Sequence, residues 1–327
     1  MSLYLVTGAS GEIGLAVIKL LRSQNIAVRA MVRSQVKGRA AEELGAEIII
    51  GDLTDRTSLD RAVKGCSGVY HIGAIYREAG LPESAYFSVN AEGTRQLLEA
   101  SIAAGVKRFV HTSTGGVLGD IKNPPGSHET PYAPGDLYQR SKTEGEKIAL
   151  EYFRSGKIPG VVIRPAMVYG PGDTRHLKLF RMIARGKFFY VGPGDKSVHF
   201  IDIRDLARAF HLAMEQTELN GEIYHIAGEA PLPLRDAVNL IADHLGVTRP
   251  WLHLPIKLTQ LIGTICETLC APFGISPPIY RRRVDFFTKA RFFDTTKATR
   301  ELGFRPALSS REEIIAVTDF FRIHKLL

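Results

Sequence analysis

The feature that most constrains this chain is a glycine-rich loop placed directly after its first apolar segment. Residues 3–7 are short and mainly apolar, and Gly8-Ala9-Ser10-Gly11-Glu12-Ile13-Gly14 follows at once. In such a loop the first glycine permits a tight turn, the second lets backbone N–H groups approach a pyrophosphate, and the third lets the next helix pack closely. The spacing G-x-x-G-x-x-G is one residue wider at its start than the commonest dinucleotide fingerprint. We expect a dinucleotide to be held by Gly8, Ser10, Gly11, Glu12, Ile13 and Gly14.

Short apolar segments alternate with helical patterns through the first half of the chain. Strands are predicted over 3–7, 27–32, 47–50, 68–72, 108–112 and 160–163. Between them, apolar residues recur at spacings of three and four, as at Ile13, Val17, Ile18 and Leu21. Alternating strands and helices predict right-handed βαβ units and a parallel sheet covered on both faces. The expected fold class is α/β, a Rossmann-type doubly wound parallel sheet.

The regular alternation ends after Arg164. We expect residues 1–164 to form a dinucleotide-binding core, to which segments near 201–227 and 291–306 return. The first of these contains a predicted helix around 205–214 and a strand over 222–226. Segments 165–200 and 228–290, rich in prolines and irregular loops, are predicted to form a smaller, mostly C-terminal substrate-binding lobe built from insertions. Residues 307–327 are expected to form a C-terminal helix.

Composition excludes several classes of protein. Hydrophobic residues make up 45% of the 327 residues and charged residues 23%, which is ordinary for a globular protein and excludes disorder, collagen-like fibres and small disulfide scaffolds. The formal net charge of +8 suits an anionic ligand but is too diffuse to indicate nucleic acid. Three cysteines cannot pair completely, which favours a reducing compartment. With no signal-peptide pattern and no apolar stretch of spanning length, we expect a cytoplasmic protein.

The end of the second predicted strand bears on the choice of cofactor. NAD sites usually place a carboxylate there, whereas this chain has Arg33 and Ser34, with Lys37 close behind. A guanidinium can bind a 2′-phosphate through two hydrogen bonds, so NADP(H) is preferred, NAD(H) remains possible, and the alternative is a set of solvated surface cations. Asp52 and Leu53 follow the third strand. Asp52 is expected either to contact the adenine amino group or to cap the next helix.

A tyrosine and a lysine provide the candidate catalytic pair. Tyr138 and Lys142 lie in LYQRSKTEGEK, where a spacing of four puts them on one face of a helix. A nearby ammonium would stabilise the phenolate and lower the pKa of the tyrosine, as proton exchange with a carbinol oxygen requires. The strand before them ends in His111-Thr112-Ser113-Thr114. A hydroxyl at this strand end can donate a hydrogen bond to a substrate oxygen. Thr114 is the preferred candidate, and Ser113 is the second.

These motifs together resemble those of the extended short-chain dehydrogenase/reductases, and most closely the branch similar to dihydroflavonol reductases and 3β-hydroxysteroid dehydrogenases. The resemblance runs from residue 5 to about 306 and also rests on Val69-Tyr70-His71-Ile72-Gly73-Ala74, Val89-Asn90-Ala91-Glu92-Gly93-Thr94, Arg164-Pro165 with Val168-Tyr169-Gly170-Pro171-Gly172, and Lys297 with Glu301-Leu302-Gly303-Phe304 and Pro306.

The resemblance implies roles for particular residues. It assigns the catalytic hydroxyl, tyrosine and lysine to Thr114, Tyr138 and Lys142, and a supporting role to Asn90. It also implies a homodimer formed through the helices that begin near Tyr86 and Tyr138. The implied cofactor contacts further along the chain are Ala74, Thr112, Tyr138, Lys142, Pro165 and Val168.

Two reactions are compatible with this resemblance. The first is NADP(H)-dependent interconversion of a ketone and a secondary alcohol on a fairly apolar small molecule; the alternative is a nucleotide-sugar epimerase with tightly bound NAD(P). Sugar-nucleotide enzymes of this type usually place a diphosphate-binding arginine where this chain has Val198, although Arg175 and Lys178 could compensate. This difference favours the first reaction. A dinucleotide-sensing protein without chemistry is a third possibility, and the intact Thr114, Tyr138 and Lys142 set argues against it.

The segment 252–278 carries an apolar stripe. Leu258, Leu261, Ile262, Ile265 and Leu269 recur at helical spacing. Such a stripe is expected to pack in the core, with pocket lining or a peripheral membrane contact as alternatives, the latter because Arg281-Arg282-Arg283 follows. Cys266 and Cys270 lack nearby histidines, so no metal site is expected.

Overall fold

The protein is built around a seven-stranded parallel sheet. The computed structural model describes residues 2–78, 80–270, 284 and 287–327. The strand order is β11-β6-β5-β4-β1-β2-β3, which confirms the predicted doubly wound α/β fold. The strands are β1 (Leu3–Thr7), β2 (Ala27–Val32), β3 (Glu47–Ile50), β4 (Gly68–His71), β5 (Arg108–Thr112), β6 (Gly160–Pro165) and β11 (Ile223–Ile226).

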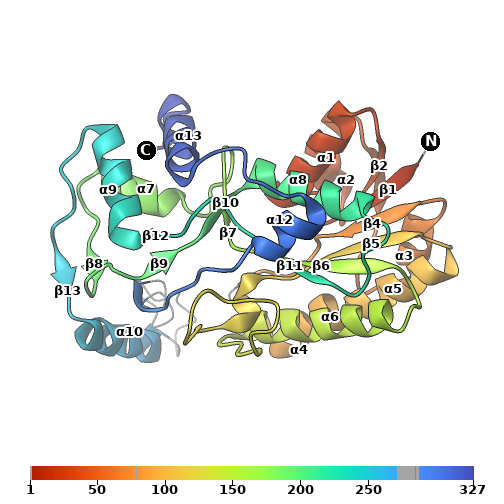
Figure 1. Ribbon diagram of the computed structural model, residues 1–327, viewed down its shortest axis with the longest axis horizontal. Coiled ribbons are helices and arrows are strands. Elements are labelled where there is room, and N and C mark those ends of the chain that lie inside the picture. Colours follow the sequence, from red (N-terminus) through yellow and green to blue (C-terminus); the bar gives the residue numbers. More distant parts are fainter. Residues whose placement is uncertain (1, 79, 271–283, 285–286) are drawn as a thin grey trace.

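The strands bury alternate residues on opposite faces of the sheet. On one face Val6, Tyr70 and Val110 pack with helices that include α1 (Glu12–Ser23) and α8 (Ile203–Glu215); on the other, Leu5 and Val69 pack with α3 (Arg56–Val63), α5 (Gly93–Ala103) and α6 (Leu137–Arg154). Figure 1 shows these two helical layers above and below the sheet. Side chains on both faces of each strand are therefore apolar, as a doubly covered parallel sheet requires.

The core contains further helices. They are α2 (Gln35–Glu43), α4 (Glu83–Phe87), the π-helix η1 (Ser88–Glu92), the 3₁₀-helix η2 (Gly115–Leu118) and α12 (Thr296–Leu302). The helix α12 contributes Ala298 and Leu302 to the same cluster as α1 and α8. The return of segment 291–306 to the core thus buries apolar residues against β11.

A second cluster of apolar side chains lies beyond the carboxyl edge of the sheet, at the left of Figure 1. Its core includes Phe180, Tyr190, Val198, Val238 and Phe321. The last helix therefore contributes to this cluster and does not form a separate unit. The elements of this region are β7 (Met167–Tyr169), α7 (Leu177–Ala184), β8 (Tyr190–Val191), β9 (Ser197–Val198), β10 (Phe200–Asp202), β12 (Leu232–Pro233), α9 (Leu234–Leu245), β13 (His253–Leu254), α10 (Ile256–Cys270) and α13 (Ser310–Ile323).

The apolar stripe of α10 is exposed among the described residues. Its five large side chains, from Leu258 to Leu269, are 38–65% accessible, and only Thr259 and Gly263 of the helix are buried. The expectation of core packing is therefore wrong for the described part of the chain, because α10 turns its small residues inward. The Arg281-Arg282-Arg283 run lies outside the described residues. In the part of the chain that is described, no helix is long and apolar enough to cross a membrane.

Candidate active site

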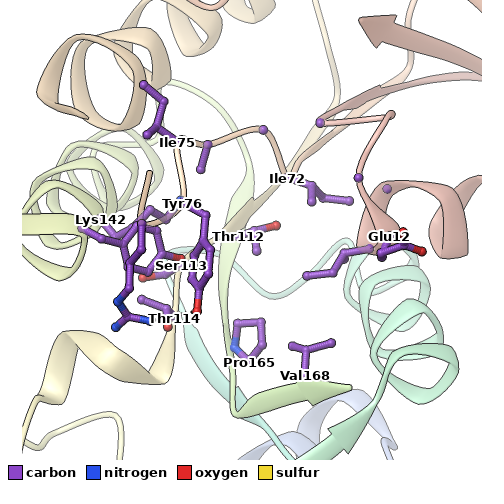
Figure 2. Close-up of a pocket in the computed structure, with 18 of the residues that line it drawn as sticks. Glu12, Ile72, Ile75, Tyr76, Thr112, Ser113, Thr114, Lys142, Pro165 and Val168 are labelled. Atoms are coloured by element: carbon purple, nitrogen blue, oxygen red, sulfur yellow. Dashed lines mark hydrogen bonds between the residues drawn. The ribbon is translucent and has the colours of Figure 1, made fainter. Parts of the chain in front are cut away.

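A cavity of about 650 Å³ lies at the carboxyl edge of the parallel sheet. The segments that follow six of the seven strands, β1 to β6, contribute to its wall, because parallel strands all end at this edge. It brings together the residues that the sequence predicted for cofactor binding or catalysis, with the exception of Ser34 and Lys37. In Figure 2, Glu12 lies across the cavity from Lys142 and Thr114, and Pro165 and Val168 line the wall between them.

Ser34 does not line this cavity. It is exposed and immediately precedes α2, where its side chain makes no capping hydrogen bond. The chain leaves β2 at Val32 and enters α2 at Gln35, and of the two residues between them Arg33 lines the cavity and Ser34 does not. Of the basic residues proposed there, Arg33 lines the cavity and Lys37 does not.

The glycine loop requires its glycines for different reasons. Gly8 has a φ of +67°, and a Cβ at this position would lie 2.7 Å from the backbone nitrogen of Gly73. A Cβ on Gly14 would lie 2.4 Å from the Gly8 carbonyl oxygen. At Gly11 the nearest atom would be 3.4 Å away, which is ordinary contact. The first and third glycines therefore hold the turn and the helix together, while the second leaves backbone open to a ligand.

The start of α1 is suited to an anion. Gly11 precedes the helix and offers no side-chain cap, so the first N–H groups of α1 are not satisfied by a capping side chain. Ser10 and Gly11 of the loop before it and Ile13 of its first turn line the cavity. The residues present therefore fit the pyrophosphate of a nicotinamide dinucleotide.

Asp52 does not cap the helix that follows it. Its Oδ1 accepts hydrogen bonds from the backbone nitrogen of Thr54 at 2.8 Å and from the Thr54 hydroxyl at 2.7 Å. Asp55 caps α3 instead, by accepting from the Thr57 nitrogen at 3.0 Å. Burial alone would raise the pKa of Asp52, but the Thr54 hydrogen bonds and the charge of Arg33 lower it. Asp52 and Arg33 thus provide an anion and a cation to the wall of the cavity.

Tyr138 and Lys142 project from the first turns of α6, and both line the cavity. Lys142 is 2% exposed, and burial lowers its pKa to about 8 although the carboxylate of Glu146 opposes this. Burial and the neighbouring Tyr76 raise the pKa of Tyr138, whereas Arg77 and Arg175 act to lower it. Among the cations around the Tyr138 ring, Arg77 and Arg175 act to lower this pKa, and the expected effect of Lys142 stays a prediction.

The two candidate hydroxyls differ in their partners. Ser113 is buried and donates to the carboxylate of Glu146. Thr114 is partly exposed, and its Oγ1 accepts from the Gly116 nitrogen at 3.1 Å, a bond that does not use the hydroxyl proton. Thr114 is therefore better placed to donate to a substrate oxygen.

Glu146 belongs to a buried ion pair behind these groups. Arg164 and Glu146 are 1% and 0% exposed, and their side chains meet at 2.5 Å. Tyr132 also donates to Glu146, at 2.7 Å. A buried pair is tolerated only when such hydrogen bonds satisfy the remaining oxygen lone pairs, as they do here. The pair joins β6 to α6 and fixes the helix that carries Tyr138.

A second network fixes the segment after β4. Asn90 accepts from the Ile75 nitrogen at 2.8 Å and donates to the Ile75 carbonyl at 3.0 Å and to the Ser141 hydroxyl at 2.9 Å. Asn90 lies in the π-helix η1, a form of helix often found at functional sites. It joins the loop after β4 to α6.

His71 is held in its neutral form. Thr7 Oγ1 accepts from the nitrogens of Ile72 and Gly73 and therefore donates to His71 Nδ1, at 2.8 Å. The other ring nitrogen then donates to Thr94 at 3.0 Å. Burial lowers the pKa of His71 to about 3, which agrees with a structural role.

Several lining residues carry no signal in the sequence. Tyr76 and Arg77 come from the loop after β4, and Arg291 and Phe293 from the segment that returns near the end of the chain. A Cβ on Gly115 would lie 2.4 Å from the Phe293 ring, so contact with a residue far along the chain requires a glycine there. Only the tertiary contacts could reveal these residues.

Val198 lies in β9 and is 3% exposed in the core of the second apolar cluster, so it does not reach the cavity. It pairs with Arg291, which does line the cavity. Arg175 also lines it, with its guanidinium bound to the buried Asp173, whereas Lys178 does not.

Several known proteins are similar to this chain. The model of the NAD dependent epimerase/dehydratase family matches residues 4–227. Sterol demethylase protein B of Methylococcus capsulatus is 31% identical over 97% of this chain and 98% of its own length. A putative dihydroflavonol 4-reductase of Synechocystis is 28% identical over 98% of this chain and 95% of its own length. The crystal structure of gox2253 superimposes with a TM-score of 0.83 and 29% identity, covering 100% of both chains.

Proposed function

Because the chain belongs to the NAD-dependent epimerase/dehydratase family, we propose that it is an NADP(H)-dependent reductase or dehydrogenase of a fairly apolar small molecule. The chain is an NAD(P)-dependent oxidoreductase of the extended short-chain dehydrogenase/reductase type. The reaction proposed is the interconversion of a ketone and a secondary alcohol. The observation that carries the proposal is the convergence of Thr114, Tyr138 and Lys142 on one cavity beside the glycine loop.

The proposed mechanism assigns one task to each of these side chains. The bound nicotinamide would supply or accept the hydride. Thr114 would donate a hydrogen bond to the substrate oxygen and stabilise the charge that develops there. Tyr138 would donate its proton to that oxygen in reduction and accept a proton from it in oxidation. Lys142 would bind the nicotinamide ribose.

The apolar character of the substrate is supported by the cavity wall and by the relatives. Ile75, Met167 and Phe293 line the cavity beyond the catalytic set. The names of two relatives refer to a sterol and to a dihydroflavonol. We propose that the region around α7, α9 and α10 selects the substrate, because it faces this end of the sheet.

The mechanism is tested by replacing Tyr138 with phenylalanine. Tyr138→Phe removes only the hydroxyl, so NADPH binding, followed by fluorescence, should stay within about twofold, while turnover of a ketone falls by at least about 10²-fold. Wild-type turnover in this variant would refute the mechanism. Tyr132→Phe is the matched control, since its hydroxyl bonds Glu146 and Tyr132 does not line the cavity.

The preference for NADP(H) rests on Arg33. Exposed at the end of β2 and lining the cavity, it can bind a 2′-phosphate, and no carboxylate follows this strand directly. We expect Arg33→Asp to weaken NADPH binding by roughly tenfold to a hundredfold, the value of a lost charge-assisted hydrogen bond, and to change NADH binding little. If Arg33→Asp weakened the binding of NADPH and NADH equally, Arg33 would not be the residue that binds the 2′-phosphate.

The alternative is nucleotide-sugar epimerisation with NAD(P) retained through the cycle. It is favoured by one observation, that Arg175 and Arg291 line the cavity and could meet a diphosphate. Incubation with UDP- and GDP-sugars distinguishes the two reactions. Net oxidation of NADPH with an apolar ketone supports the reductase, whereas sugar interconversion without net change in cofactor supports the epimerase.

We also propose that the protein is a homodimer in the cytoplasm. The family resemblance supports an interface on the helices that begin near Tyr86 and Tyr138. These are α4 with its continuation in η1 and α5, and α6, and they contact one another on one face of the sheet. Light scattering coupled to size-exclusion chromatography tests the state directly. A single species with the mass of one 36.0 kDa chain would refute the dimer.

A further inference from the structure

Arg77 contacts Tyr138, the proposed proton donor, although it belongs to no motif found in the sequence. Its guanidinium carbon lies 5.2 Å from the ring centroid of Tyr138 and 5.2 Å from that of Tyr76. Its Nη1 donates to the Tyr76 hydroxyl at 2.9 Å. The two tyrosine rings meet edge to face, with centroids 4.9 Å apart. Arg77 therefore contacts both aromatic rings at the cavity wall.

Arg77 is also tied to the helix that carries Tyr138. Its Nε donates to Asp136 Oδ2 at 2.8 Å, and Nη2 approaches the same carboxylate at 2.8 Å. The other oxygen of Asp136 caps α6 by accepting from the Gln139 nitrogen at 2.8 Å. Asp136 thus uses one oxygen for the helix and one for Arg77, and the side chains of the pair are only 27% and 28% exposed.

The loop on which Arg77 stands is held in place. Ile75, two residues earlier, is bound through both its backbone groups by Asn90. A cation held at a fixed position beside an aromatic ring can stabilise negative charge on that ring without first having to move. The side chain of Arg77 is 27% exposed, so most of it is shielded from solvent. These contacts give Arg77 a fixed place relative to the Tyr138 ring.

We propose that Arg77 is a positioning residue that holds the Tyr138 ring and electrostatically stabilises its phenolate during proton transfer. The proposal deepens the proposed function and rests on Tyr138 as the group that exchanges the proton. The charged and titratable groups that face Tyr138 are Tyr76 and Arg77 from the loop after β4, Asp136 at the N-cap of α6, Lys142 on α6, and Arg175 from the loop after β7. Arg77 and Arg175 favour the phenolate, whereas Tyr76 and Asp136 disfavour it.

Replacing Arg77 and replacing Asp136 are predicted to shift the pH dependence of alcohol oxidation in opposite directions. Arg77→Gln removes the cation, so the pH at which alcohol oxidation reaches half its maximal rate should rise by about one unit, a tenfold change in acid dissociation. Asp136→Asn removes the opposing anion and keeps an N-cap, so that pH should fall by about half a unit. Arg77→Lys keeps the positive charge, so its pH profile should lie close to that of the wild type.

A purely structural role would give a different pattern. If the ion pair only anchored the loop to α6, Arg77→Gln and Asp136→Asn would lose the same contact and would lower kcat together, with no change in the pH profile. Shifts of the same sign, or no shift in either variant, would overturn the proposal. Arg77→Lys and Asp136→Asn keep it testable if Arg77→Gln does not fold.

A second measurement needs no substrate. Tyrosines replaced by a difluorotyrosine titrate at lower pH and can be followed by fluorine NMR, with the Tyr138 signal identified by its loss in Tyr138→Phe. In the NADP⁺-bound protein the midpoint of this signal should shift upward in Arg77→Gln and downward in Asp136→Asn. Opposite shifts support the role of Arg77 even if no carbonyl compound is turned over, a result that would refute the proposed function alone. Unchanged midpoints would refute the role of Arg77.

Discussion

Replacing Lys142 with methionine is expected to stabilise the nucleotide-free protein at pH 7. The lysine is 2% exposed, and burial lowers its pKa from 10.5 to about 8. At about 1.4 kcal/mol per pKa unit, holding the charged ammonium in this position costs the folded state roughly 3 kcal/mol. Methionine keeps a similar length without the charge. We expect the free energy of unfolding to increase by about 1–3 kcal/mol, while turnover is lost.

The stability gained by Lys142→Met is predicted to depend on pH. Below about pH 8 the lysine is protonated in both the folded and unfolded states, so the full cost is present. Between about 8 and 10.5 the unfolded chain binds more protons than the folded one, so the stability of the wild type rises with pH. The advantage of Lys142→Met should therefore shrink through this window and disappear above it.

Urea denaturation followed by circular dichroism at pH 7, 9 and 10 measures this directly. Glu146 should remain satisfied in the variant because Arg164, Tyr132 and Ser113 still bond it. Lys147→Met on the exposed face of α6 is the matched control and should change stability little. A less stable Lys142→Met protein at pH 7, or a gain that does not depend on pH, would refute the reasoning.

Two further outcomes test the glycine loop and α10. Gly14→Ala should abolish NADPH binding or lower stability by more than about 2 kcal/mol, because its Cβ would lie 2.4 Å from the Gly8 carbonyl oxygen. Gly11→Ala should have a much milder effect, because the nearest atom to its Cβ would be 3.4 Å away and its φ is −93°. Equal losses of NADPH affinity in the two variants, measured by NADPH titration, would contradict this prediction. Leu261→Gln and Ile265→Gln should each change the free energy of unfolding by less than about 0.5 kcal/mol, since these side chains are 57% and 47% exposed. Thermal or urea unfolding measures this change. A loss above about 2 kcal/mol would show that the apolar stripe of α10 is packed.

Local patterns were sufficient for the sheet. Strands such as 3–7 and 108–112 were predicted at their observed bounds, because a strand buried on both faces is short, apolar and β-branched. Errors occurred at strand ends: 160–163 extends to Pro165, 68–72 ends at His71, and 222–226 begins at Ile223. Hydrogen bonding between neighbouring strands decides such ends, and neighbours in space are not neighbours in sequence.

Spacing could not decide how α10 is oriented. A stripe at helical spacing shows that one face of a helix is apolar, but not which face turns inward. In the structure Thr259 and Gly263 are buried and Leu261 is exposed. The choice depends on which side of α10 meets the rest of the protein.

The sequence by itself determined the glycine loop, the parallel sheet and the family, because each depends on residues close together in the chain. It also indicated Tyr138 and Lys142, which are one helical turn apart. Only the tertiary structure decided which charges surround the Tyr138 ring. Arg77 follows β4 of the seven-stranded sheet and Arg175 follows β7 of a separate two-stranded sheet, and the charges of both act on Tyr138. Electrostatic effects depend on distance in space, which spacing along the chain does not report.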